Sequence, residues 1–262
     1  MRLRTVQSSS LKVISEVLKE LVNDVNLVFD NSGMSLVCTN GARCVLIDLK
    51  LNAENFEEFW CPNPTRIGLN MTSFHKLLKT CSVRDTLTLS IANDKSNELN
   101  FEIGCAEKNA TTRFNLKLLD VDYVCINAPS VDFDCVATMS SGYFQKTLRD
   151  MSALTAGNPV VVIEARKDST ISMSTSGDFA SQETVVGVAE GTNIQVQTDD
   201  WETIRGSYSL KFLTQFAKTS ALSGSVDLMI KREYPLVVRF AVAGLGYVRY
   251  ITQGLAEDDL DA

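Results

Sequence analysis

Two stretches of the chain follow the same plan: Ser10-Leu11-Lys12-Val13-Ile14-Ser15-Glu16-Val17-Leu18-Lys19 and Ser209-Leu210-Lys211-Phe212-Leu213-Thr214-Gln215-Phe216-Ala217-Lys218. In each, the second lysine follows the first by seven residues, so both lysines fall on one stripe of an α-helix and the apolar residues on another. Both stretches are therefore predicted to be amphipathic helices with a cationic face. One such helix is typical of an ordinary solvated surface, but its repetition indicates that the cations face a common partner.

A second pair of stretches resembles each other in the same way. Phe74–Lys79 and Phe144–Arg149 both place a cation two and five residues after the phenylalanine and a leucine four residues after it. Four predicted helices thus carry two cations each, on the opposite side from their apolar residues. We expect these cations to bind DNA: Lys12, Lys19, Lys76, Lys79, Lys146, Arg149, Lys211 and Lys218.

The charge of the whole chain is acidic, which by itself argues against a nucleic-acid partner. The 262 residues carry a net charge of −7, and 45% of them are hydrophobic. However, eight of the 25 Lys and Arg residues lie on the predicted helices, so the charge is segregated and a cationic face can hold a polyanion. No aromatic residues interleave with these cations, which disfavours base stacking and leaves sequence-neutral contact with phosphates.

The strand signals divide the chain into two similar halves. Short apolar runs bounded by Asn, Asp and Gly predict antiparallel strands in both halves, and the alternation stops between Leu119 and Asp132. The expected organisation is an N-terminal domain (1–118), a connecting loop (119–133), a C-terminal domain (134–255) and an acidic tail (256–262). The fold class is therefore α+β, built as a tandem repeat of one domain.

The remaining composition favours a binding protein of the cell interior. The seven cysteines are odd in number and none shows Cys-x2-Cys spacing, which indicates reduced thiols and no metal site. No apolar run reaches the length of a membrane span, and no signal peptide is evident. An enzyme lacks support because there is no Gly-rich phosphate loop, no nucleophile elbow and a single histidine, His75, which is expected at the surface. No cofactor is expected.

The chain resembles the sliding clamps, specifically the proliferating cell nuclear antigen family of eukaryotes and some of their large DNA viruses. The similarity is distributed over nearly the whole length, through Val6–Leu21, Asn70–Cys81, Lys117–Asp122, Ser141–Ser152, Leu210–Lys218 and, most specifically, Tyr234–Tyr250. The resemblance implies two clamp-fold domains per chain and a homotrimeric ring. In that ring helices line the hole, antiparallel sheets form the outside, and duplex DNA passes through the middle. It also implies a processivity factor that binds DNA polymerase, a clamp loader, and nuclease and ligase peptides, in the nucleus or at a viral replication site.

The resemblance further implies a pocket for partner peptides beside the connecting loop. Carried over by position, the lining is Thr39, Arg43, Cys44, Leu46, Ile126, Ala128, Pro129, Pro235, Ile251 and Gln253. Several residues depart from the family pattern: Thr39 replaces Met, Arg43 replaces His, Ala128 replaces a larger aliphatic residue, and Ile251 replaces Tyr. Thr252-Gln253-Gly254 stands in place of Leu-Ala-Pro. Because such pockets depend on a few buried anchors, the preferred peptide should differ from that of other clamps.

Closing a ring requires two unpaired edge strands that pair head to tail. The candidates are Thr111–Lys117 and the segment Gly177–Thr184. The predicted interface residues are Thr111, Arg113, Asn115, Lys117 and Phe179. Three chains would bring 24 of the predicted cations around the hole. Lys167, beside Asp168, lies near a position that carries regulatory modification in the family, although the local spacing differs.

Two alternatives keep the domain pair without the homotrimer. The chain could be a monomeric polymerase accessory factor, or one subunit of a mixed checkpoint-type clamp. The mass in solution distinguishes both from the homotrimer.

Overall fold

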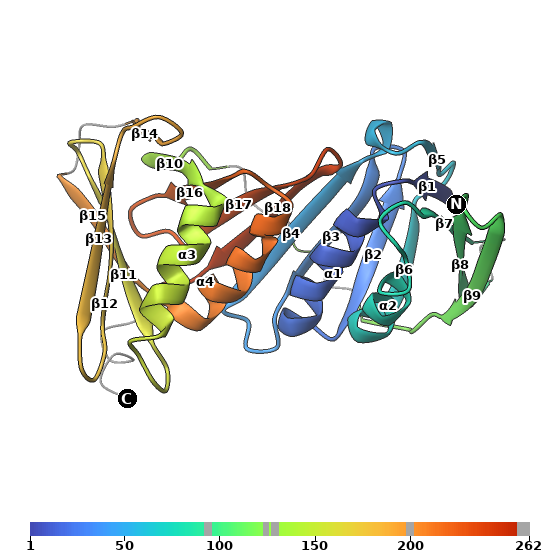
Figure 1. Cartoon of the computed structure of the whole chain (residues 1–262), viewed down its shortest axis with the longest axis horizontal. Coiled ribbons are helices and arrows are strands. Elements are labelled where there is room, and N and C mark those ends of the chain that lie inside the picture. The colour runs from blue at the N-terminus through green and yellow to red at the C-terminus, as the bar shows by residue number, and fades with distance from the viewer. Residues whose placement is uncertain (92–95, 123–125, 127–130, 198–201, 256–262) are drawn as a thin grey trace. The chain divides into compact units, whose positions relative to one another are not determined.

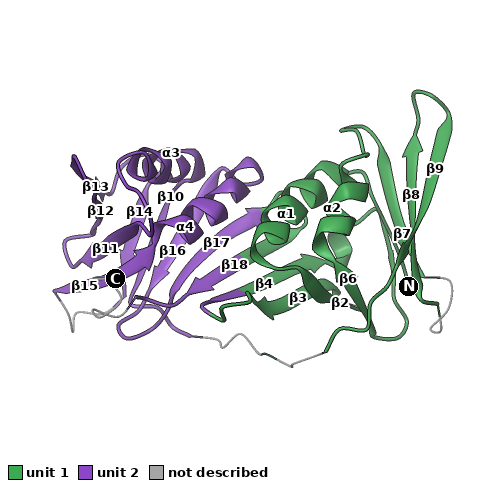
Figure 2. Ribbon diagram, turned by 90° about the horizontal axis from the view of Figure 1, so that it is seen from below, with its two compact units in different colours: residues 1–43, 47–128, 242–248 green, residues 44–46, 129–241, 249–262 purple. Residues whose placement is uncertain are grey.

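The computed structural model describes residues 1–91, 96–122, 126, 131–197 and 202–255 of the chain. The chain forms two compact units, coloured separately in Figure 2. Unit 1 comprises residues 1–43, 47–128 and 242–248, and unit 2 comprises residues 44–46, 129–241 and 249–262. Each unit therefore takes a short piece from the other half of the chain, whereas the sequence suggested two uninterrupted domains. The exact boundaries at residues 118 and 133 stay a prediction.

The described residues of the first half form two α-helices among nine strands. In order, the elements are β1 (Arg2–Thr5), α1 (Ser8–Leu21), β2 (Asp24–Asp30), β3 (Gly33–Thr39), β4 (Val45–Asn52), β5 (Glu58–Trp60), β6 (Thr65–Asn70), α2 (Met71–Leu78), β7 (Thr86–Ser90), β8 (Glu98–Cys105) and β9 (Ala110–Lys117). A short 3-10 helix, Ala53–Asn55, follows β4.

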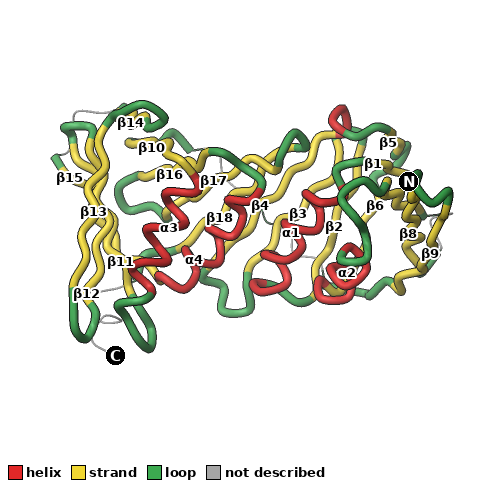
Figure 3. The backbone as a smooth tube through the Cα atoms, viewed as in Figure 1, coloured by secondary structure: helices red, strands yellow, loops and turns green. Residues whose placement is uncertain are grey.

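The second half repeats this order. Its elements are β10 (Cys135–Ser140), α3 (Ser141–Ser152), β11 (Val160–Arg166), β12 (Thr170–Ser176), β13 (Ser181–Gly187), β14 (Asn193–Val196), β15 (Thr203–Ser209), α4 (Leu210–Ala217), β16 (Ser225–Ile230), β17 (Leu236–Val242) and β18 (Gly246–Thr252). A 3-10 helix, Lys218–Ala221, extends α4. Both halves thus read strand, helix, five strands, helix, three strands, which confirms the predicted α+β repeat (Figure 3).

The strand pairing repeats as well. The hydrogen-bonded order β5-β1-β7-β8-β9 in the first half corresponds to β14-β10-β16-β17-β18 in the second, and β4-β3-β2-β6 corresponds to β13-β12-β11-β15. In this correspondence β9 matches β18, and β13 matches β4. β4 and β18 each contribute residues to both units, and they are hydrogen-bonded neighbours. Just beyond the ends of these two strands, within unit 2, the Gln253 N–H donates to the Cys44 carbonyl at 3.2 Å.

The helices cover the strands in pairs, α1 with α2 in unit 1 and α3 with α4 in unit 2 (Figure 1). Each helix places one apolar stripe in the core, as the sequence periodicity predicted. The buried stripe residues are Leu11, Ile14, Val17 and Leu18 in α1, Phe74 and Leu78 in α2, Phe144, Leu148 and Met151 in α3, and Leu210, Leu213, Phe216 and Ala217 in α4. Burial of these side chains supplies most of the free energy that holds helices of only 8 to 14 residues in place.

The helices α2 and α3 each begin with a side-chain cap from the strand before them. The cap of α2 is Asn70, whose side chain accepts a hydrogen bond from the Ser73 N–H at 3.0 Å. Asn70 is the last residue of β6 and keeps an extended backbone, so its amide oxygen reaches the first turn of the helix. Ser140 at the end of β10 caps α3 in the same way, through the Tyr143 N–H.

Candidate functional site

All eight predicted DNA-binding cations lie on a helix or at its C-cap. Lys76, Lys146, Arg149 and Lys211 are exposed within α2, α3 and α4, and Lys79 and Lys218 are exposed C-cap residues. The two cap positions also have a structural use, because a cation near a helix C-terminus stabilises the helix dipole. Lys12 and Lys19 of α1 are half-buried, and Lys19 lies 4.0 Å from the Glu16 carboxylate.

The helix pair of unit 1 gathers its cations around the single histidine. His75 was expected at the surface, but it is only 5% exposed, and its Nδ1 lies 2.9 Å from the Ser15 hydroxyl on α1. The pKa of His75 is lowered, chiefly by burial and next by the nearby charge of Lys19; Glu16 opposes this shift, and Lys79 adds a smaller lowering effect. Cations from both α1 and α2 therefore act on the same buried imidazole, which favours its neutral form.

The predicted peptide pocket is only partly assembled within the described residues. Pro235 and Gln253 line an open cleft of about 720 Å³ in unit 2. Sequence reasoning missed its other principal walls, which are Ile204, Tyr208, Lys231, Tyr234 and Leu255. Tyr234 precedes the predicted Pro235 and Leu255 lies two residues after the predicted Gln253, but only the fold brings β15 beside them.

The other predicted pocket residues stand in different environments. Cys44 and Leu46 are half-buried members of unit 2, and Thr39, Arg43 and Ile126 belong to unit 1. Ile251 is only 9% exposed and is not among the residues that line this cleft. Ala128 and Pro129 lie outside the described residues. The pocket as a whole remains a prediction.

Both predicted closing segments contribute to strands at sheet edges, although β13 (Ser181–Gly187) shares only Ser181–Thr184 with the predicted segment Gly177–Thr184. β9 is the outer strand of the sheet β5-β1-β7-β8-β9, and β13 is the outer strand of β13-β12-β11-β15. Thr111, Arg113, Asn115 and Lys117 are exposed on one face of β9. Phe179, just before β13, is 77% exposed, which is unusual for so large an apolar side chain.

Three observations on the described residues concern metal ligands, thiols and membrane-spanning helices. No group of three or more His, Cys, Asp or Glu side chains in that part of the chain could hold a metal ion. The six described cysteines form no disulfide, and burial raises the pKa of the Cys38 thiol to about 12. None of the described helices is long and apolar enough to cross a membrane.

Lys167 lies in the turn between β11 and β12, where the Ser169 backbone is left-handed with φ of 60°.

Comparison with known proteins identifies the family. The model for the N-terminal domain of proliferating cell nuclear antigen matches residues 1–125, and the model for its C-terminal domain matches residues 127–254. The chain belongs to the proliferating cell nuclear antigen family. The clamp fold that the resemblance implied is thereby confirmed.

Two relatives agree with this assignment over nearly their whole length. The chain is 32% identical over 254 residues to the probable DNA polymerase sliding clamp 1 of Paramecium bursaria Chlorella virus 1, covering 95% of this chain and 94% of the relative. It is 30% identical over 262 residues to the proliferating cell nuclear antigen of Chaetomium thermophilum, covering 98% of each chain. The chain is accordingly a sliding clamp that acts as a polymerase processivity factor in DNA replication, in a family of non-enzymatic scaffold proteins.

Proposed function

We propose that three copies of this chain close into a homotrimeric ring that encircles duplex DNA. The observation that carries the proposal is the strand correspondence of the two halves. β4 and β18 are hydrogen-bonded neighbours, whereas their counterparts β13 and β9 end their sheets. Pairing β9 of one copy with β13 of the next repeats the β18–β4 neighbourhood between chains. It also removes two exposed edges that would otherwise invite irregular association.

The mass in solution tests the ring. Light scattering at micromolar concentration should give about 86 kDa, three times the chain mass of 28.8 kDa. A stable species of one chain mass would instead favour the monomeric accessory factor. A trimer that forms only with a different chain would favour the mixed checkpoint-type clamp.

The eight helix cations are proposed to hold the duplex by its phosphates. Exposed lysines on short helices can contact phosphates loosely and exchange between them, which suits a ring that must slide. Replacing Lys76, Lys79, Lys146 and Arg149 with Ala should leave the trimer intact and shorten its retention on DNA. The salt dependence of binding should also become shallower, by about 0.9 in slope for each phosphate that the protein no longer neutralises.

A matched variant controls for the loss of charge alone. Arg2, Arg84, Lys108 and Arg232 lie outside the helices and are also exposed, so their replacement with Ala removes the same charge elsewhere. Processivity of a polymerase on primed circular DNA, with its clamp loader present, should fall for the helix variant only. Equal losses in both variants would contradict the DNA-facing assignment.

Partner recruitment is proposed at the cleft that contains Pro235 and Gln253. Its walls combine Tyr208 and Tyr234 with charged rim residues, which suits a short peptide with apolar anchors and polar flanks. Polymerase, the clamp loader, nucleases and ligases are the proposed owners of such peptides, in the nucleus or at a viral replication site. Calorimetric titration with peptides from these partners tests the proposal, and a Pro235→Asp variant should weaken binding while the trimer persists.

A further inference from the structure

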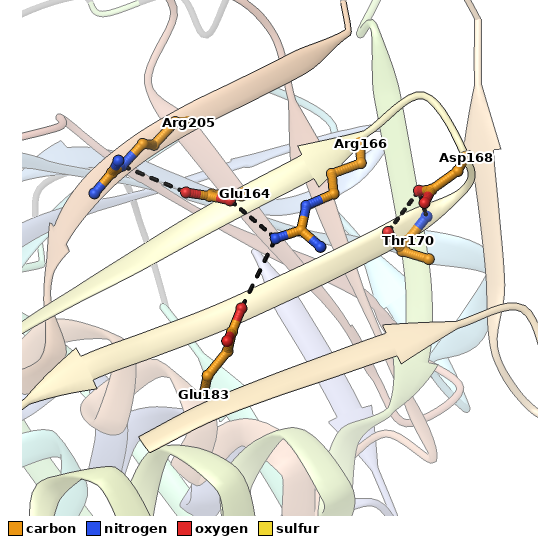
Figure 4. Close-up of polar contacts among 6 residues, drawn as sticks. All are labelled: Glu164, Arg166, Asp168, Thr170, Glu183 and Arg205. Atoms are coloured by element: carbon orange, nitrogen blue, oxygen red, sulfur yellow. Dashed lines mark hydrogen bonds and ion pairs between the residues drawn. The ribbon is translucent and has the colours of Figure 1, made fainter. Parts of the chain in front are cut away.

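The outer face of one sheet in unit 2 carries a row of ion pairs that alternate in sign and end at the sheet edge. Arg205 on β15 lies 3.5 Å from Glu164 on β11, and Glu164 lies 3.2 Å from Arg166 on the same strand. Arg166 then reaches across β12 to Glu183 on the edge strand β13, at 3.8 Å (Figure 4). The row finishes with an acidic group, and β13 itself contains no Lys or Arg.

The edge strand in unit 1 has the opposite polarity. Arg113 on β9 pairs with Glu102 on β8, with 2.8 Å between Arg113 Nε and Glu102 Oε2. Lys117 follows on the same face of β9, and the strand contains no Asp or Glu. This second row therefore runs from an acid inside the sheet to cations at its edge.

We propose that ring closure joins the two rows into one, with Glu183 of one copy meeting Arg113 or Lys117 of the next. The inference rests on the proposed ring and adds what makes its interface selective. The joined row would read Arg205, Glu164, Arg166, Glu183 and then Arg113 and Glu102 of the neighbouring copy. Each of the four inner groups then lies between two charges of opposite sign. Isolated exposed pairs contribute little, but a connected network holds its side chains in place and contributes more.

The contact between Glu183 of one copy and a cation of β9 in the next does not depend on a particular strand register. Phe114 of β9 lies opposite the buried Phe101, so Arg113 and Lys117 share the other, outer face of that sheet. Thr184 of β13 lies opposite the buried Met173, so Glu183 likewise points to the outer face of its sheet. The outer positions of β9 are Thr111, Arg113, Asn115 and Lys117, with cations at alternate places. In an antiparallel pair, Glu183 opposite any of the four is directly or diagonally beside a cation.

The same polarity opposes the wrong assemblies. Two β9 strands paired together would bring Arg113 and Lys117 of one copy toward those of the other, and two β13 strands would bring Glu183 toward Glu183. Like charges directly opposite one another destabilise a strand pair. The partner selected is therefore a second copy of this chain in head-to-tail orientation, which is the arrangement that allows a ring to close.

Charge reversal tests the proposal in the full-length chain. Glu183→Lys alone, and Arg113→Glu together with Lys117→Glu, should each raise the dissociation constant about three- to tenfold per interface, measured by sedimentation at about 0.1 M salt. The double variant combines both sets of reversals in every copy, so each interface is complementary again whichever cation Glu183 meets, and trimer stability should return toward that of the wild type. Each change disturbs its own sheet as much in the double variant as alone, so recovery reports on the interface. Raising the salt concentration should weaken the wild-type trimer, because the pairs are exposed.

A control variant and two opposing outcomes complete the test. Glu54→Lys makes the same change of charge at an exposed position on the 3-10 helix after β4, and it should leave the trimer unchanged. Single variants that trimerise as tightly as the wild type, or a double variant without recovery, would overturn the joined row while leaving the ring intact. A wild-type chain that is monomeric at micromolar concentration would overturn the ring itself.

Discussion

The two Ser-Leu-Lys helices, α1 and α4, share a sequence plan but occupy different places in the repeat. In both halves the chain order is strand, helix, five strands, helix and three strands, so α1 corresponds to α3 and α2 corresponds to α4. The likeness between α1 and α4 therefore does not follow the duplication. The common requirement is an apolar stripe against a sheet with two cations on the other side, and both helices meet it with nearly the same residues.

The buried sides of these helices use different chemistry at matching positions of the sequence plan. Val17 of α1 corresponds to Phe216 of α4, whose ring stacks on Tyr250 with centroids 4.5 Å apart. Ser15 of α1 corresponds to Thr214 of α4. The Ser15 hydroxyl meets the titratable His75, whereas the Thr214 hydroxyl lies 3.2 Å from the Ser152 hydroxyl, which does not titrate near neutral pH. Unit 1 thus has a helix contact that responds to pH, and unit 2 has one that depends on aromatic packing.

The largest expected effect comes from removing the aromatic ring. Phe216→Ala should lower the free energy of unfolding by about 3–5 kcal/mol, because a fully buried ring leaves a cavity beneath Tyr250. Val17→Ala at the corresponding position should cost only about 2 kcal/mol, since it deletes two carbons. Urea denaturation followed by circular dichroism measures both. Equal losses would show that the two helices depend on packing to the same extent.

The second prediction concerns pH. The folded pKa of His75 lies below its ordinary value because burial and Lys19 disfavour the imidazolium. The unfolded chain then binds the proton more readily, so this contribution to stability is complete above about pH 6.5 and is lost as the pH falls through the folded pKa. Thermal unfolding at pH 7.5 and 5.5 should show a larger loss for the wild type than for His75→Gln.

The other titratable groups are common to both proteins, so the difference between the two losses isolates the histidine. The control variant is Gln145→His. It places a histidine in α3 at the position after Phe144, just as His75 follows Phe74 in α2. If His75→Gln lost as much stability on acidification as the wild type, the buried imidazole would not be the cause.

The smallest expected effect is a difference in DNA binding between the cations of α1 and those of α4. Lys211 and Lys218 are exposed, whereas Lys12 and Lys19 are half-buried and Lys19 lies beside Glu16. Lys211→Ala with Lys218→Ala should therefore reduce the salt slope of DNA binding by about 1–2, and Lys12→Ala with Lys19→Ala by less. Fluorescence anisotropy with labelled duplex at several salt concentrations measures both slopes. A larger reduction of the salt slope for the Lys12 and Lys19 variant than for the Lys211 and Lys218 variant would contradict the prediction.

Much of the fold could be predicted from the sequence because its signals are local. The alternation of Phe114 and Leu116 with Arg113 and Asn115 indicates a strand, and in β9 the two apolar residues are half-buried while Arg113 and Asn115 are exposed. The helix stripes were equally clear. His75 was misjudged because its burial depends on α1, which lies 60 residues away at Ser15. The cap at Asn70 could not be predicted, because hydrophobic periodicity does not show at which residue β6 ends and α2 begins.

The candidate sites, too, combine features that the sequence predicts with features that only the fold shows. By itself the sequence determined which residues form each helix stripe and that both halves repeat one plan, because side-chain periodicity follows from backbone geometry alone. The sequence could not show that β9 and β13 are the edge strands of their sheets, or that Glu183 forms an ion pair with Arg166 across β12. Nor could it show that Tyr208 lines the cleft beside Pro235. Only the tertiary structure decided these features, because strand order and contacts between distant segments depend on how the whole core packs.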